Sequence, residues 1–181
     1  GDSAQNAVGD TAAGNIWDNF DGRTTGAAKL SESGMSTNSM HYTLPSMVDG
    51  LTVSASYSPN KGQDESDTAY ALVYTGVEGL SVSYGAGSND AAAGTTLDAD
   101  VTTMKASYAY GSVTVAYSDH EYDSATATRD QDTTSYSIAY TVSDAISVTY
   151  GTEEIDSGET TTDAEYSKIS ASYTAGGLTV T

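Results

Sequence analysis

The sequence predicts an all-β protein, an up-and-down antiparallel transmembrane β-barrel, and three observations support this class. From Ser39 onward, apolar and polar residues alternate with a period of two, as in strands with two different faces. Short and long connections between the predicted strands also alternate, which is typical of an antiparallel meander. Tyrosine occurs 14 times against one Phe and one Trp, and it gathers at the ends of the apolar faces.

The composition excludes several other classes of protein. The 181 residues include six Lys or Arg and 25 Asp or Glu, so the formal net charge is −19. So acidic a chain is unsuited to nucleic acid, because phosphate binding requires clustered cations. Cysteine is absent, which excludes a disulfide scaffold and a cysteine-ligated zinc site. No apolar run reaches the roughly 20 residues of a transmembrane helix.

Residues 1–38 are the first element, and they show no alternation. They are rich in Gly, Ala, Asn and Asp, and they hold the single Trp and the single Phe, Trp17 and Phe20. We expect a long loop here, with a short helical turn over 15–20. Long loops without secondary structure are usually functional or disordered.

About ten short strands are predicted in residues 39–181. Their apolar faces lie, in chain order, at 40–44, 51–57, 70–74, 80–84, 104–110, 113–117, 136–140, 146–150, 169–173 and 178–180. The tight turns fall at 45–50, 75–79, 111, 141–144 and 174–177, and the long connections at 58–67, 87–100, 119–132 and 151–163. The hairpins recur at nearly constant spacing, which suits paired barrel strands better than four-stranded propeller blades.

The two strand faces favour a membrane barrel over a water-soluble sandwich. The apolar face carries Tyr, Ala and Val rather than the large aliphatic residues of a sandwich core. Tyrosines at both ends of that face are typical of the aromatic girdles of outer-membrane barrels, although Tyr is also simply a good strand residue. The other face is rich in Ser, Thr and Gly, as in a wet lumen. Most acidic residues fall in the long connections at one rim, and Glu165 alone is predicted within a strand, where it would face outward with Ile169.

The predicted strands leave two open sheet edges, which lipid excludes and water tolerates poorly. We therefore expect the sequence to be part of a longer barrel. The hairpins at 45–57 and 74–84 resemble those of general porins of Gram-negative bacteria, above all the acidic, tyrosine-rich porins of marine alphaproteobacteria. This resemblance implies a homotrimer of barrels in the bacterial outer membrane, each with about 16 strands, of which about ten are present here. It also implies a water-filled diffusion channel for small hydrophilic solutes and ions, without enzymatic activity, in contact with outer-membrane lipid and lipopolysaccharide.

The resemblance further implies a constriction, because one extracellular loop of these porins folds into the lumen and faces basic groups on the wall. Residues 1–38 would be that loop, and 39–181 the strands. The loop candidates are Asp10, Asp18, Asp21, Arg23 and Glu32. The pore-lining candidates, which share the parity of the polar face, are Lys105, Lys168 and His41. Each could instead be a solvated residue, and the wall lacks the arginine cluster common in the family. The net charge predicts a weak preference for cations.

Other functions have less support in the residues. His41 and His120 are far apart, and neither H-E-x-x-H nor G-x-S-x-G occurs, so no catalytic or metal residue is predicted. No cofactor is expected beyond loosely bound divalent cations at the acidic connections, for example near 64–67 and 153–156, which lack the spacing of a calcium-binding loop. The alternative to a channel is a secreted or cell-surface β-rich adhesion or binding module that uses the acidic loops. A propeller-like glycan-binding protein is a weaker alternative.

Overall fold

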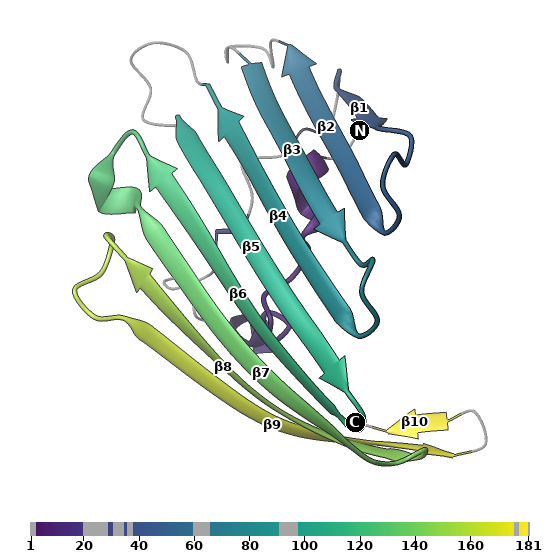
Figure 1. Cartoon of the computed structure of the whole chain (residues 1–181). Helices are drawn as coiled ribbons and strands as arrows, with labels where there is room; N and C mark the ends of the chain where they lie inside the picture. Colours follow the sequence, from purple (N-terminus) through teal and green to yellow (C-terminus); the bar gives the residue numbers. More distant parts are fainter. Residues whose placement is uncertain are drawn as a thin grey trace.

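The computed structural model describes residues 3–19, 29–30, 35, 38–59, 66–90, 98–175 and 178–180. One curved antiparallel sheet contains all ten strands of this part, and each strand pairs with its neighbours in sequence (Figure 1). The strands are β1 Met40–Thr43, β2 Leu51–Pro59, β3 Ser66–Tyr74, β4 Leu80–Asn89, β5 Ala99–Tyr110, β6 Val113–Ser124, β7 Gln131–Ser143, β8 Ile146–Ser157, β9 Ala164–Ala175 and β10 Leu178–Val180. The predicted meander is confirmed in class, order and number of strands.

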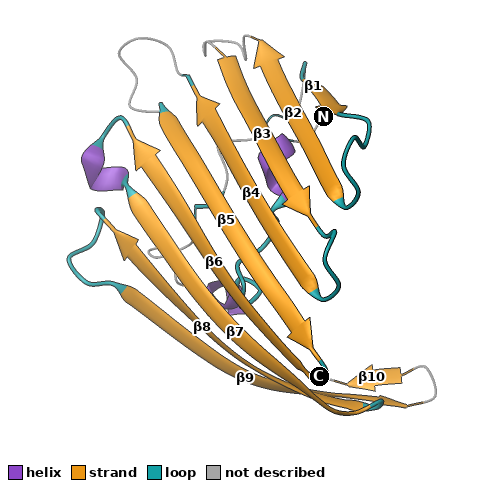
Figure 2. Cartoon of the chain, in the orientation of Figure 1, coloured by secondary structure: helices purple, strands orange, loops and turns teal. Residues whose placement is uncertain are grey.

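Three short 3-10 helices complete the secondary structure of this part. They are η1 Ala4–Ala7, η2 Ile16–Asn19 and η3 Ala127–Arg129. Figure 2 shows η1 and η2 against one face of the sheet, whereas η3 lies in the connection between β6 and β7. The described residues include no helix with the length and hydropathy of a membrane span.

Glycines with positive φ close the tight turns. Gly50 and Gly79 have φ of +74° and +77°, a region that other residues rarely adopt. A Cβ atom at Gly50 would collide with the backbone of Gly76, and one at Gly79 would collide with the carbonyl oxygen of Ala109. These two turns therefore require glycine for both conformation and space.

The strands are longer than the sequence pattern predicts. β6 and β7 pair as far as Tyr122 and Gln131, although 119–132 was expected to be a long connection. The reason is that pairing satisfies backbone N–H and C=O groups whatever the side chains are. Many acidic residues consequently stand in strands, and the expectation that Glu165 alone does so is wrong. The acidic strand residues also include Asp67, Asp100, Asp119, Glu121, Asp123, Asp132, Glu153, Glu154 and Asp156.

Burial in this sheet is inverted relative to a water-soluble protein. Large hydrophobic side chains of the apolar face are exposed, for example Ile138 at 48% and Ile169 at 75%. On the polar face, by contrast, Ser118 and Ser135 are 0% exposed. The small hydrophobic clusters lie where the N-terminal residues meet the polar face, and one of them contains Ile16 of η2. The apolar face is thus turned away from the protein, as expected for a surface in lipid.

Candidate functional site

The polar face of the sheet carries the N-terminal segment, here residues 3–19, across most of its width. Strand hydroxyl groups accept hydrogen bonds from backbone N–H groups of the segment. The bonds join Ala4 N to Ser56 Oγ of β2 at 2.8 Å, Ala12 N to Ser118 Oγ of β6 at 2.8 Å, and Ala13 N to Ser135 Oγ of β7 at 2.9 Å. Alternation places these serines on the polar face, so the strands supply the acceptors that the irregular segment lacks internally.

Two strand glycines make room for the segment. A Cβ atom at Gly151 of β8 would lie 2.8 Å from the Cβ of Ala13. A Cβ atom at Gly85 of β4 would lie 3.0 Å from side-chain atoms of both Gln5 and Val8. Neither glycine has a positive φ. At Gly151 the nearest obstacle to a side chain is Ala13 of the segment, whereas a Cβ atom at Gly85 would also lie 3.0 Å from Thr103 Oγ1 of the neighbouring strand β5. Their lack of a side chain serves the close approach of the segment.

Glu153 of β8 is a buried anchor of the N-terminal segment. Its side chain is only 2% exposed, and its Oε2 accepts hydrogen bonds from Thr11 Oγ1 at 3.2 Å and from Ile16 N at 3.0 Å. Beside it, Ile16 packs in a hydrophobic cluster with Ile155 of β8 and Tyr166 of β9. A buried carboxylate that accepts two hydrogen bonds holds both ends of the turn between Thr11 and η2.

Both predicted wall lysines contact the N-terminal segment. Lys105 of β5 donates from Nζ to the carbonyl oxygens of Asp10 at 2.7 Å and Thr11 at 3.3 Å. Lys168 of β9 donates from Nζ to Asn19 Oδ1 at 3.4 Å. The two cations therefore bind the segment as well as lining the polar face. In the strand order of the sheet, Lys105 on β5 and Lys168 on β9 lie on opposite sides of Glu153 on β8.

The remaining predicted residues are more dispersed. His41 of β1 lies on the polar face opposite Ser56 and is exposed, with Nε2 3.5 Å from Thr43 Oγ1. The carboxylate of Asp10 accepts a hydrogen bond from Asn15 Nδ2 at 2.9 Å, and Asp18 is exposed in η2. Asp21, Arg23 and Glu32 lie outside the described residues.

His120 was expected in an acidic loop, and that expectation is wrong. It lies in β6 with its side chain 1% exposed, between Thr103 of β5 and Thr133 of β7 in the register of the sheet. The alternation of β6 turns His120 to the polar face and its neighbours Asp119 and Glu121 to the other face. In the described ranges, no three His, Asp or Glu side chains are placed to hold a metal ion.

A second contact joins the N-terminal region to the acidic rim. Lys29 Nζ lies 3.6 Å from Glu159 Oε1, donates to the carbonyl oxygen of Arg129 at 2.8 Å and stands 4.8 Å above the ring centroid of Tyr122. Arg129 Nε in turn lies 3.7 Å from Glu159 Oε1. Exposed ion pairs contribute little stability individually, so this cluster orients the connections more than it holds them.

Sequence reasoning missed Glu153, Gly151 and the acceptor serines. Glu153 was assigned to a long connection because of its acidic neighbours. The sequence did contain a signal for Glu153. Ile155, two residues later, puts an apolar side chain on the same polar face, which indicates that this face is covered by protein beyond the expected end of the strand. The serines carried no such signal, because Ser is common on the whole polar face.

Removing the acceptor of Glu153 is expected to loosen the N-terminal segment. In Glu153→Leu the buried Thr11 hydroxyl and Ile16 N–H lose their partner, at a cost of about 1–3 kcal/mol for a buried unsatisfied group. Hydrogen exchange of the amides of 11–16, measured on the folded protein in detergent, should accelerate. Glu154→Leu, on the opposite face of the same strand, is the matched control, and equal exchange in the two variants would contradict the anchor.

The fold and this site define a class of protein. An antiparallel meander with an exposed apolar face, tyrosines at the ends of that face and a polar face covered by chain is part of the wall of an outer-membrane β-barrel. The family model of Gram-negative porins matches residues 2–181, so the chain belongs to the Gram-negative porin family. Its location is therefore the bacterial outer membrane.

The structure is similar to that of a solved porin refined at 1.8 Å resolution. The TM-score is 0.68 at 21% sequence identity, and the match covers 97% of this chain. The chain spans 65% of the length of that porin. No match was found among the curated proteins. The narrower resemblance to marine alphaproteobacterial porins stays a prediction.

Proposed function

We propose that the chain forms part of a water-filled diffusion channel for small hydrophilic solutes and ions, in which residues 1–38 narrow the lumen. The observation that carries this proposal is the seating of residues 3–19 on the polar face by Glu153, Lys105 and the strand serines. A segment with many side-chain anchors keeps a constant position, so it narrows a pore instead of plugging it intermittently. Family membership and the polar wall support passage of solutes through diffusion rather than through a catalysed step.

Selectivity in this proposal comes from the charges around the segment. Lys105 and Lys168 are cations of the wall, Asp10 and Asp18 lie on the segment, and the chain carries a net charge of −19. Because Lys105 is paired with carbonyl oxygens of the segment, its charge is partly offset locally. We therefore propose a weak preference for cations.

The experiment is a planar bilayer recording of the detergent-extracted full-length protein under a salt gradient. We expect stepwise conductance with a reversal potential of the sign that indicates cation preference. Closure in three equal sublevels would support a homotrimer, which we propose from family membership. Silent bilayers with protein that is folded and inserted by gel mobility would refute the channel.

Neutralising Lys105 is expected to increase cation preference and to weaken the seating of the segment. Lys105→Met keeps most of the length of the side chain but removes the ammonium donor to the carbonyl oxygens of Asp10 and Thr11, of which that of Thr11 still accepts from Gly14 N. The reversal potential in the same recordings should move further in the cationic direction. Lys168→Met removes the same charge but only one hydrogen bond to the segment, the 3.4 Å bond to Asn19 Oδ1. It should therefore shift the reversal potential in the same direction, with a smaller increase in current noise than Lys105→Met. An unchanged reversal potential in both variants would remove these lysines from the selectivity mechanism.

A further inference from the structure

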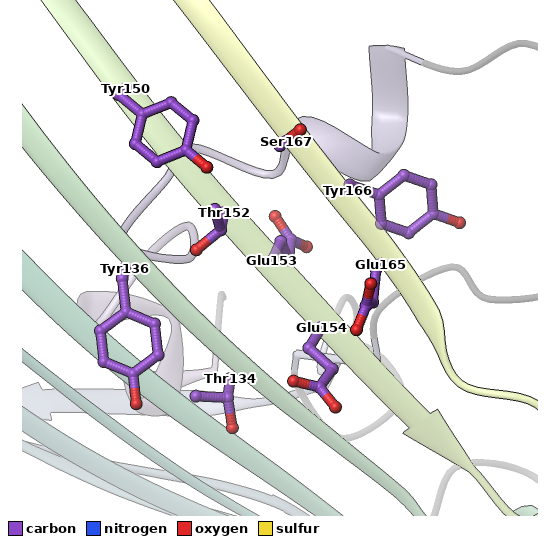
Figure 3. A pocket seen from close by; sticks show the side chains of 9 residues that line it. All are labelled: Thr134, Tyr136, Tyr150, Thr152, Glu153, Glu154, Glu165, Tyr166 and Ser167. Carbon is purple, nitrogen blue, oxygen red and sulfur yellow. The ribbon is translucent and has the colours of Figure 1, made fainter.

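A pocket of about 430 Å³ lies on β7, β8 and β9, and most of the side chains that line it belong to the outward face of the sheet (Figure 3). Its outward residues share the parity of Ile138, Tyr150 and Ile169. Seven of the lining residues lie on the outward face: two tyrosines, three residues with hydroxyl groups and two glutamates. The other two belong to the polar face, where they contact the N-terminal segment. The tyrosines are Tyr136 and Tyr150, the outward glutamates are Glu154 and Glu165, and the hydroxyl residues include Thr152 and Ser167.

Two carboxylates face each other in this pocket. Glu154 of β8 and Glu165 of β9 are direct cross-strand partners, and Figure 3 shows their side chains next to each other. Like charges directly opposite each other destabilise a strand pair. In the described ranges, the ion pairs join Lys29 and Arg129 to Glu159, and none reaches Glu154 or Glu165. A positively charged ligand between the two carboxylates would remove their repulsion.

Aromatic and apolar groups adjoin the carboxylates. The rings of Tyr136 and Tyr150 are 56% and 45% exposed and present faces that attract organic cations. Next to Tyr150 in the register stand Ile138 and Ile169, which belong to the exposed apolar face. A hydrated metal ion would use the carboxylates alone, whereas an ammonium group on a hydrocarbon chain would use the carboxylates, the rings and the apolar strip together.

We propose that this pocket binds a lipid with a positively charged amine headgroup. The ammonium group lies between Glu154 and Glu165, hydroxyl groups of Thr152 and Ser167 are available to the rest of the headgroup, and the hydrocarbon chain runs along Tyr150 and Ile169. Charge complementarity selects the headgroup, and continuity with the apolar face selects a lipid over a soluble cation. The inference rests on the membrane placement of the proposed function, but not on conduction.

The test uses the full-length protein in a neutral detergent and dodecylammonium as the probe. Binding is followed by native mass spectrometry and by the thermal unfolding midpoint. The variant Glu154→Gln/Glu165→Gln removes both charges with little change in shape. Glu121→Gln/Asp123→Asn is the matched control, because it removes the same charge from the same face of β6, outside the pocket. Bilayer recordings of each protein report the channel separately.

We expect wild-type protein and the control to bind dodecylammonium about tenfold more tightly than the glutamine variant. Without ligand, the glutamine variant should unfold at a higher temperature than wild type, because the repulsion is gone. Equal binding of dodecylammonium by all three proteins would overturn the site. Equal losses of affinity in the two variants would also overturn it, because binding would then depend on the total negative charge of the surface and not on this pocket. Displacement of the probe by spermidine would show a soluble polyamine site, and displacement by Mg²⁺ would show a metal site; either result refutes the lipid. Conductance lost with binding intact would refute the channel and leave the pocket standing.

Discussion

Replacing Ile138 with arginine is expected to prevent stable insertion of the barrel. Ile138 lies in β7 between Tyr136 and Tyr140, in the middle of the exposed apolar face, with 48% of its surface exposed. An Arg at the bilayer midplane on the lipid face of a barrel costs about 2–4 kcal/mol. That is a large part of the stability of an ordinary domain.

The neighbouring residue supplies the matched control for this prediction. Ala139 points to the polar face, where the register places it between Thr114 and Thr149. Ala139→Arg introduces the same side chain one residue away, so it should insert nearly as well as wild type. The measurement is the fraction of refolded protein with heat-modifiable gel mobility after addition to lipid vesicles. Equal insertion of the two variants would show that the apolar face does not meet lipid.

Replacing Gly151 with leucine is expected to unseat the N-terminal segment without disturbing the strand. A Cβ atom there would already lie 2.8 Å from the Cβ of Ala13, so a leucine cannot fit beneath the segment. Overpacking of this kind typically costs roughly 1–3 kcal/mol, and an irregular segment yields more easily than a paired strand. The hydrogen bonds from Ala13 N to Ser135 Oγ and from Ile16 N to Glu153 Oε2 should be lost together.

If the segment narrows the pore, Gly151→Leu should raise the single-channel conductance and admit larger neutral solutes in a liposome-swelling assay. Thr149→Leu is the control, because it places the same leucine side chain on the same face of β8 two residues earlier, where a side chain already stands. A conductance that stays at the wild-type value, together with faster hydrogen exchange in 11–16, would show that the segment moves without controlling the pore.

Much of the fold could be predicted from the sequence because strand periodicity is local. A period of two assigns Ile138 and Ala139 to opposite faces without knowledge of any distant contact. The tyrosines at the strand ends and the glycines in the turns are equally local signals. The strand ends were predicted less well, because pairing continues into acidic sequence such as 119–123 wherever a neighbouring strand offers partners.

The candidate site was less accessible to sequence reasoning. Lys105 and Lys168 were placed on the correct face by parity, but their contacts with Asp10, Thr11 and Asn19 depend on the path of the segment. Glu153 was hidden among loop acids, although it reaches Thr11, 142 positions away in the chain. No local pattern encodes a partner at such a separation.

Sequence alone therefore determined the class of sheet, the order of its strands and the sense of its faces, since alternation, turn glycines and tyrosine placement act over a few residues. The tertiary structure decided which polar residues hold the N-terminal segment and which carboxylates come together. Ser118, Ser135 and Glu153 became anchors only when strand register and sheet curvature brought them beneath residues 11–16. Glu154 and Glu165 became neighbours through the same register, on the opposite face of the sheet.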